Sequence, residues 1–322
     1  MTQHTRSLPA VHIVILNWNN APDTLACLQS VAQLTYPNYT ALVVDNGSTD
    51  SSTDRVHSAF PDTEILELKA NLGYAEGNNA GIRRAIESGA DYVFVLNNDT
   101  LIAPDALAEL VEAAESRPQI GMVGPLMRCA DPPDTLFAAG SFIAWAKGET
   151  WHRGMFEPAE RYAALQQPEP VDFVSGCGVL VRRQLIERAG ALDTSFYLNY
   201  EDVEWAVRAR RFGHQAWLVP KAVLWHKISA TLGRISPANV YYMTRNELFF
   251  FWRNGPRHLR GLAAARIVLR TLRTIGAWTL RSQYQTPAFR VMRDANLLAL
   301  RDFFQGRSGK MNPDVAAVCY PN

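Results

Sequence analysis

The segment YVFVLNNDT, residues 92–100, passes from five apolar or aromatic residues directly into four polar ones. A short apolar run of this kind is typical of a buried strand, which we predict over residues 92–96. Asp99 then follows the end of the strand. Because Mg²⁺ and Mn²⁺ prefer oxygen ligands, Asp99 is a candidate metal ligand. The alternative is that Asp99 caps a helix that begins near Pro104.

The same succession of strand and helix occurs throughout the N-terminal half. Alternating strands and helices predict a mostly parallel sheet with helices on both faces, an α/β fold. The predicted strands cover residues 11–16, 41–44, 65–68, 92–96, 172–182 and 218–225, and the predicted helices 24–34, 76–88, 104–115, a segment around 184, and 206–212. Between residues 129 and 170 the pattern predicts loops and a hairpin-like insertion.

Polar residues follow the ends of several predicted strands. Asn17, Asp45, Asn97 to Asp99 and His226 all occupy such positions. Ligands bind at this edge of open parallel sheets, so we expect these side chains to surround one ligand. Asp45 can contact a nucleotide base, close a turn or do both. A lone histidine such as His226 is more often a hydrogen-bonded surface or core residue than a ligand, but its position on the same expected edge as Asp99 favours a ligand role.

Two acidic residues, Glu201 and Asp202, precede the predicted helix 206–212. They can simply favour the start of that helix, because its N-terminus attracts negative charge. In the functional interpretation Asp202 faces the ligand cleft and accepts a proton from an attacking hydroxyl. A glycine-rich helix entry at residues 73–79 suits close backbone approach. The sequence lacks both the dinucleotide-binding glycine motif and a P-loop, which argues against those nucleotide sites.

The overall composition excludes several classes of protein. The 322 residues carry a net charge of only +1, so no strong attraction to nucleic acid is expected. The four cysteines are widely spaced, which argues against a disulfide framework or zinc cluster and fits a reducing compartment. Residues 1–10 lack the apolar core of a signal peptide, and no apolar stretch reaches the roughly 20 residues that span a bilayer. We expect a cytoplasmic protein, with peripheral binding to the inner face of the plasma membrane as an option.

The C-terminal region differs in charge from the rest of the chain. No acidic residue occurs between Leu248 and Arg293, a window that contains nine arginines. Residues 236 to about 307 have a helical pattern, so we divide the chain into domains 1–235 and 236–322. Helical spacing places Arg266, Arg270, Arg273 and Arg281 on one face. That face suits an anionic membrane surface, or it is the solvated side of a helix packed on the main domain.

Taken together, these motifs resemble those of the inverting family 2 glycosyltransferases, which have the GT-A fold. The resemblance covers about residues 11–230, and Arg245-Asn246 with the helical tail resembles the rhamnosyltransferase-like branch. Each motif alone is modest, but the ordered set is very specific. It comprises Asn17-Trp18-Asn19, residues 44–48, Asn71-Leu72-Gly73 with Gly77-Asn78, Asn98-Asp99, residues 176–178, Glu201-Asp202 and His226.

The resemblance implies a role for each matching residue. Asp99 corresponds to the last aspartate of the family's D-x-D motif and would bind Mg²⁺ or Mn²⁺, with His226 completing the metal or diphosphate site. Asp202 corresponds to the presumed base. The remaining implied sites are nucleotide-sugar binding by Asn17, Asp45, Gly73, Asn78 and Asn98, and acceptor binding by Glu201, Trp205 and Arg208. Asn97 departs from the pattern, since an aspartate often stands there, and one negative charge near the metal is lost.

The implied reaction transfers a sugar from a dTDP-, UDP- or GDP-sugar to a hydroxyl of a glycan or lipid-linked acceptor. In one in-line displacement the metal neutralises the leaving diphosphate while Asp202 takes the acceptor's proton. Two alternatives stay open. One is a sugar nucleotidyltransferase, although its glycine-rich and basic signature is replaced here by Asn17-Trp18-Asn19. The other is a non-catalytic nucleotide-sugar-binding scaffold.

Overall fold

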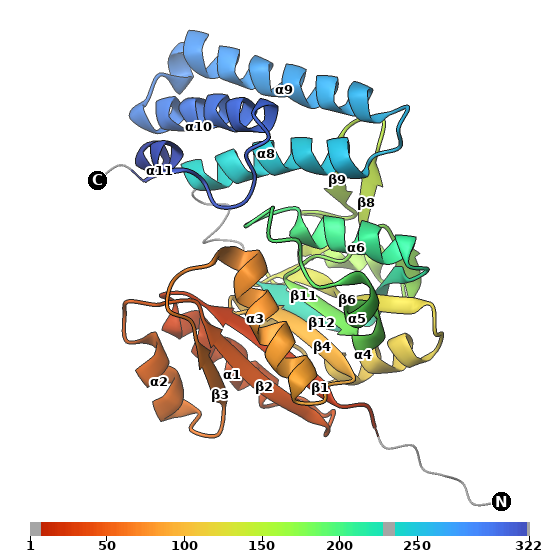
Figure 1. Cartoon of the computed structure of the whole chain (residues 1–322). Helices are drawn as coiled ribbons and strands as arrows, with labels where there is room; N and C mark the ends of the chain where they lie inside the picture. The colour runs from red at the N-terminus through yellow and green to blue at the C-terminus, as the bar shows by residue number, and fades with distance from the viewer. Residues whose placement is uncertain (1–7, 228–235, 321–322) are drawn as a thin grey trace, which may run out of the picture.

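The computed structural model describes residues 8–227 and 236–320. Figure 1 shows a sheet flanked by helices, with a separate layer of C-terminal helices above it. The predicted α/β fold with a helical C-terminal region is therefore confirmed. The domain boundary that we placed at residue 235, and residues 1–7 of the N-terminal segment, lie outside the described residues.

The central sheet is mixed, with a parallel half built from the first four predicted strands. Along the main path the strand order is β10-β12-β6-β11-β4-β1-β2-β3, while β5 pairs with β12 and β7 pairs with β6. The strands of this sheet are β1 (Val11–Asn17), β2 (Tyr39–Asp45), β3 (Glu64–Glu67), β4 (Tyr92–Asn97), β5 (Thr100–Ile102), β6 (Ile120–Cys129), β7 (Leu136–Ala138), β10 (Glu169–Val171), β11 (Gly178–Arg182) and β12 (Gln215–His226).

Alternate side chains of the strands enter two separate cores. On β1, Val14 packs into the core beneath α3 (Gly73–Glu87), whereas Ile13 and Ile15 pack on the opposite face with residues of α1 (Ala21–Val31) and α4 (Ala106–Glu115). Successive strand residues point to opposite faces, so a strand covered on both sides is apolar throughout. This is the reason that the runs at residues 11–16 and 92–96 lack polar alternation.

Three details differ from the sequence prediction. The strand expected over 172–182 begins only at Gly178, because residues before it form a loop in which the Asp172 carboxylate accepts a hydrogen bond from the Ile143 amide. The helix expected over 206–212 is α6 (Glu201–Arg211), so Glu201 and Asp202 belong to its first turn. A final helix, α11 (Pro313–Cys319), was not predicted.

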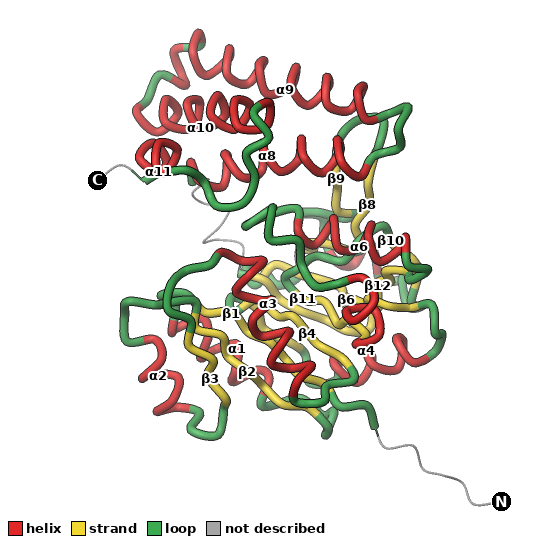
Figure 2. Tube along the Cα trace, viewed as in Figure 1, coloured by secondary structure: helices red, strands yellow, loops and turns green. Residues whose placement is uncertain are grey.

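The expected hairpin insertion is present as a separate two-stranded sheet of β8 (Ser141–Ala144) and β9 (Glu149–His152). It extends toward the C-terminal helices (Figure 2). The remaining elements are α2 (Ser52–Ala59), α5 (Arg183–Ala189), α8 (Pro237–Asn254), α9 (Arg260–Leu280), α10 (Pro287–Phe304) and the short 3-10 helices η1 (Ala159–Tyr162) and η2 (Ser282–Tyr284).

Helix α9 docks on the turn of this hairpin through two of its arginines. The Arg266 guanidinium donates to the Ala146 carbonyl at 2.6 Å, and Arg270 pairs with both Glu149 and Glu247. Part of the predicted basic face is therefore used within the fold. In the described part of the chain, no helix is both long and apolar enough to cross a membrane.

Candidate functional site

The polar residues expected to gather at one sheet edge do so. β1 is parallel to β2 and β4, and Asn17 is in register with Asp45. β11 is antiparallel to both β4 and β6, and β6 is parallel to β12, so β12 ends at the same edge as β4. His226, the last residue of β12, thereby comes beside Asp99.

The Nε2 atom of His226 lies 3.3 Å from the Oδ2 atom of Asp99. The other oxygen of Asp99 is buried and has no hydrogen-bond partner among the described residues, and the same is true of Nδ1 of His226. The residue that caps α4 is Asp105, so Asp99 does not serve that helix. The Oδ1 atom of Asp99 is thus a buried acceptor whose lone pairs are unused, as a group that binds a cation requires.

A thiol completes the surroundings of His226. Sγ of Cys177 lies 3.8 Å from Nε2 of His226, and the Asn97 amide lies 3.6 Å from the same sulfur. Burial alone disfavours the charged imidazole, but Cys177 and Asp99 outweigh it and raise the pKa of His226. Among the described residues, no three His, Cys, Asp or Glu side chains form a metal cage by themselves. A cation held by Asp99 would therefore need further ligands from a bound substrate and water, and His226 could join them only in its neutral form.

These residues line a cavity of about 560 Å³. Asp99 and His226 contribute from the strand ends, and Glu201 and Asp202 from the first turn of α6. The hairpin contributes Thr150 and His152, and α8 contributes Asn239 and Met243. The cavity thus collects both elements of the predicted reaction, the candidate metal ligands and the candidate base.

The carboxylate of Asp202 is fixed by two backbone amides. Gly176 donates to Oδ2 and Val203 to Oδ1, each at 2.8 Å. Burial raises the pKa of Asp202, and these two amides act in the opposite direction by favouring its ionised form. The result is a positioned carboxylate whose basicity is higher than that of an exposed aspartate.

Glu201 lies next to Asp202 and is only 5% exposed. Burial and the charge of Asp202 raise its pKa. One of its oxygens, Oε2, has no hydrogen-bond partner in the described structure. Like charges close together cannot both ionise easily, so the pair favours a neutral Glu201 beside a charged Asp202.

The loop that leads into α6 adopts an uncommon backbone conformation. Tyr197, Asn199 and Tyr200 all have positive φ, of 64°, 68° and 73°. Such angles cost free energy in residues with a side chain and persist only when their surroundings enforce them. Asn246 of α8 provides this restraint, because its buried amide donates to the carbonyls of Phe196, Leu198 and Asn199.

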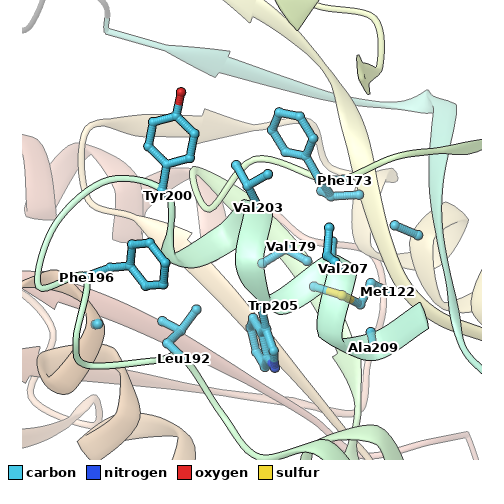
Figure 3. Packing of buried hydrophobic residues seen from close by; sticks show 14 of the residues in the cluster. Met122, Phe173, Val179, Leu192, Phe196, Tyr200, Val203, Trp205, Val207 and Ala209 are labelled. Carbon is cyan, nitrogen blue, oxygen red and sulfur yellow. The ribbon is translucent and has the colours of Figure 1, made fainter. Parts of the chain in front are cut away.

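The structure places two expected acceptor residues away from the cavity. Trp205 is fully buried, and its indole N–H donates to the Gly190 carbonyl at 2.9 Å. Figure 3 shows it among the apolar side chains that hold α6, with Leu192 nearby. Arg208 pairs with Glu204 and donates to the Ala191 carbonyl. Both residues anchor α6 to the preceding loop, so this geometry gives no support to an acceptor role for either.

The expected nucleotide residues Asn17, Asp45 and Asn98 belong to a hydrogen-bonded network at the ends of β1, β2 and β4, and none of the three lines the cavity. The Asn17 amide donates to Asp45 at 2.9 Å, and Asp45 also accepts from the backbone and hydroxyl of Ser48. Thr24 donates to Asn17 and accepts from Asn98. Asp45 therefore closes a turn, as one interpretation of the sequence predicted. The network also holds these strand ends in one fixed arrangement.

Gly73 and Asn78 lie at the start of α3. A Cβ atom on Gly73, whose φ is 85°, would lie 2.5 Å from the Tyr197 ring, so glycine is required for α3 to approach the strained loop. The Asn78 amide donates to the Tyr74 carbonyl, while its oxygen is buried without a partner among the described residues. Neither residue lines the cavity.

Several cavity residues were not assigned a role from the sequence. The Tyr74 hydroxyl donates to the Gly176 carbonyl at 2.7 Å, and burial raises its pKa well above the usual value. Cys177 lies beside His226, and His152 enters from the hairpin, with burial lowering its pKa to about 4. Tyr74 lies within the glycine-rich helix entry at residues 73–79, and Cys177 lies between two glycines, which were the only signals available.

Comparison with known proteins gives one family and several relatives. Residues 12–190 match the family model described as Glycosyl transferase family 2. The chain is 28% identical over 280 residues to the N-acetylglucosaminyl-diphospho-decaprenol L-rhamnosyltransferase of Mycobacterium tuberculosis, covering 79% of this chain and 90% of that protein. It is 22% identical to the dTDP-rhamnosyl transferase RfbF of Shigella flexneri, covering 76% and 80%.

A solved structure shares the fold. The mannosyltransferase PcManGT from Pyrobaculum calidifontis, in complex with GDP-Man and Mn²⁺, aligns with a TM-score of 0.60 at 18% identity. The alignment covers 94% of this chain and 89% of that one. At this identity the likeness establishes the GT-A architecture alone.

Proposed function

The chain belongs to glycosyl transferase family 2 and is similar to its rhamnosyltransferases, and we propose that it moves a sugar from a nucleotide diphosphate to an acceptor hydroxyl with inversion. The observation that carries the proposal is the convergence of Asp99, His226 and Asp202 on one cavity. Asp99 comes from the turn after β4, His226 from the end of β12 and Asp202 from the first turn of α6. Only a folded chain of this topology brings them together.

Asp202 is the proposed general base. Its two oxygens each accept one backbone amide, which fixes the carboxylate but leaves lone pairs for the acceptor hydroxyl. In the displacement the acceptor oxygen forms a bond to the anomeric carbon as the bond to the diphosphate breaks, and Asp202 receives the hydroxyl proton. General-base assistance of this kind contributes about 10²–10⁴-fold to the rate.

Asp99 and His226 are the proposed metal and diphosphate ligands. The unpartnered oxygen of Asp99 and the neighbouring imidazole form a suitable donor pair for Mg²⁺ or Mn²⁺. When bound, the metal would offset the negative charge that develops on the leaving diphosphate. The Asn97 amide, in place of a carboxylate, leaves this site with one fewer negative charge than the family pattern.

The strand-end network of Asn17, Asp45 and Asn98 is the proposed nucleoside side of the donor site. Asp45 and Asn17 are buried and already hydrogen-bonded, so they provide a fixed polar surface rather than side chains that reorganise on binding. Gly73 and Asn78 support this site from α3. Glu201 faces the acceptor side of the cavity, where a neutral carboxyl group can donate a hydrogen bond to a sugar oxygen.

The proposed donor is a dTDP-, UDP- or GDP-sugar, with rhamnose as the favoured sugar because two similar proteins are named as rhamnosyltransferases. The proposed acceptor is a cell-surface glycan or a lipid-linked saccharide, since the mycobacterial relative is named for a diphospho-decaprenol acceptor. A lipid-linked acceptor would place the proposed reaction at the inner face of the plasma membrane.

Thermal-shift measurements with dTDP-, UDP- and GDP-sugars, with and without Mn²⁺, test the donor site. A cognate donor raises the melting temperature, because ligand that binds only the folded state stabilises it. Release of the nucleoside diphosphate in the presence of a lipid-linked saccharide then tests transfer. Binding without any turnover by the whole panel would instead favour the non-catalytic scaffold.

A further inference from the structure

Helix α9 exposes an apolar stripe to solvent. Leu262, Leu269, Leu272 and Leu280 are 45%, 48%, 48% and 81% exposed. At 3.6 residues per turn these four positions fall within about 80° of one another. A helix that covers a domain surface normally presents charged or polar residues on its outer side. The outer side of α9 is therefore a candidate interaction surface.

An apolar groove continues this stripe onto the neighbouring helices. Its volume is about 570 Å³, and its walls come from α8, α9 and α10. Trp252 and Phe304 remain 46% and 71% exposed in it. The apolar lining residues are Phe249, Trp252, Ala264, Ala265, Val268, Phe303 and Phe304. We call the stripe and the groove together the outer face. An exposed apolar surface of this extent marks an interaction site.

Arginines border the outer face on both sides. Arg253 lines the groove, and the Arg260 guanidinium lies 5.3 Å from the centre of the Trp252 ring. Arg273 and Arg266 border the opposite side of the leucine stripe. On the helical circumference they lie about 20° and 40° from Leu262, on the side away from Leu272. In the described residues Arg273 makes no ion pair, whereas the charge of Arg270 is taken up by two glutamates.

The charge pattern identifies the partner. No acidic residue occurs between Leu248 and Arg293, so α9 and the end of α8 supply only cations and apolar groups to the outer face. Glu149 of the hairpin lies beside Arg273, and its charge is paired with Arg270. A second copy of this chain would bring the same arginines against one another across a two-fold interface, without carboxylates between them. Anionic phospholipids match both properties, because their headgroups pair with arginine and their acyl region accepts leucine and tryptophan.

We propose that the outer face binds an anionic phospholipid bilayer. The leucines of α9 with Trp252 and Phe304 enter the boundary between headgroups and acyl chains, and Arg253, Arg260 and Arg273 contact lipid phosphates. Helix α8 connects this face to the catalytic cavity. Met243 lines the cavity and Trp252 lines the groove, nine residues apart, which corresponds to about 14 Å along the helix. Membrane binding would bring the cavity near the lipid-linked acceptor proposed above, but the exposed side chains support it independently of that acceptor.

Co-sedimentation of the full chain with vesicles tests the proposal. Binding is expected to vesicles that contain phosphatidylglycerol, to be much weaker to phosphatidylcholine alone, and to fall as salt screens the arginines. The double variant Leu269→Gln/Leu272→Gln should bind at least about tenfold more weakly to both. Arg273→Gln should weaken binding about fivefold, only to the anionic vesicles.

Matched substitutions elsewhere on the surface provide the controls. Phe212→Gln removes a 41% exposed aromatic side chain at the end of α6, and Arg55→Gln removes an exposed arginine on α2. Both should leave vesicle binding unchanged. Equal binding by the leucine variant and the Phe212 variant would overturn the proposal, as would self-association through the outer face without vesicle binding. Donor-induced thermal shifts read the proposed function separately, so the two can fail independently.

Discussion

The side-chain amide of Asn246 donates to the carbonyl oxygen of Leu198 at 2.8 Å, so a residue of the C-terminal helices holds the loop that presents Glu201 and Asp202. Asn246 is fully buried and bonds two further carbonyls of the same loop. The loop contains three residues in the left-handed region, which need such restraint.

Replacement of Asn246 by alanine should therefore affect both stability and turnover. Leaving buried carbonyls without donors is expected to lower the free energy of unfolding by about 2–4 kcal/mol. Relaxation of the loop should lower kcat while donor affinity changes little, because Asp99 and His226 lie on other elements. Thr244→Val, which removes a hydrogen bond to Asn296 within the helical region, is the control. Equal effects of both variants on kcat would contradict a positioning role.

Asp202→Asn should abolish most turnover without loss of the donor. The amide keeps the shape of the side chain but cannot accept the acceptor's proton, so kcat should fall by about 10²–10⁴-fold. Donor affinity, measured by calorimetry, should stay within about twofold of wild type. Asp193→Asn, in the loop before α6, is the comparison at a carboxylate outside the cavity. Parallel loss of donor binding would count against Asp202 as the base.

Asp99→Asn should weaken the metal-dependent part of donor binding. The substitution removes the negative charge while leaving a side chain of equal size beside His226. Calorimetric titration of the nucleoside diphosphate is expected to show a strong Mn²⁺ dependence in wild type and little in the variant. Asp105→Asn, at the cap of α4, should keep the wild-type dependence. An unchanged Mn²⁺ effect in Asp99→Asn would place the metal elsewhere.

Glu201→Gln should alter how stability depends on pH. The folded-state pKa of Glu201 is raised to about 8 from an ordinary value of 4.5. Between these two values the unfolded chain releases the proton while the folded chain keeps it, so wild-type stability should fall as pH rises through this window. The glutamine variant lacks this proton and should show a shallower fall. Melting curves across the same pH range make the comparison, and identical slopes would show that Glu201 ionises normally.

The sequence was sufficient for the parallel half of the sheet and for the edge where the site lies. The apolar runs before Asn17, Asp45 and Asn97 end abruptly in polar residues, and parallel topology then brings those ends together. A strand was predicted there, but not the antiparallel direction of β11 between β4 and β6, because an apolar run does not indicate which way a strand runs. Residues 176–178 were recognised as a motif, but no role could be assigned to Cys177, which directly precedes β11.

The placement of Trp205 and Arg208 shows a second limit of sequence reasoning. The resemblance implied an acceptor role for both residues, which follow Asp202 by about one and two helical turns, but the sequence could not tell which side of α6 meets the cavity. The structure turns Trp205 into the core and uses Arg208 to hold the loop at residues 189–191. Glu201 and Asp202 reach the cavity only because they occupy the first turn of the helix, beside the strained loop.

The docking of Arg266 and Arg270 on the β8–β9 turn joins the outermost helix to the wall of the catalytic cavity. That same hairpin carries Thr150 and His152 into the cavity, so these side chains take their position partly from α9. The hairpin thus connects α9 to the cavity wall. Under the proposed function, substitutions in α9 should therefore change acceptor preference through Thr150 and His152, while the proposed metal ligands and base stay unaltered.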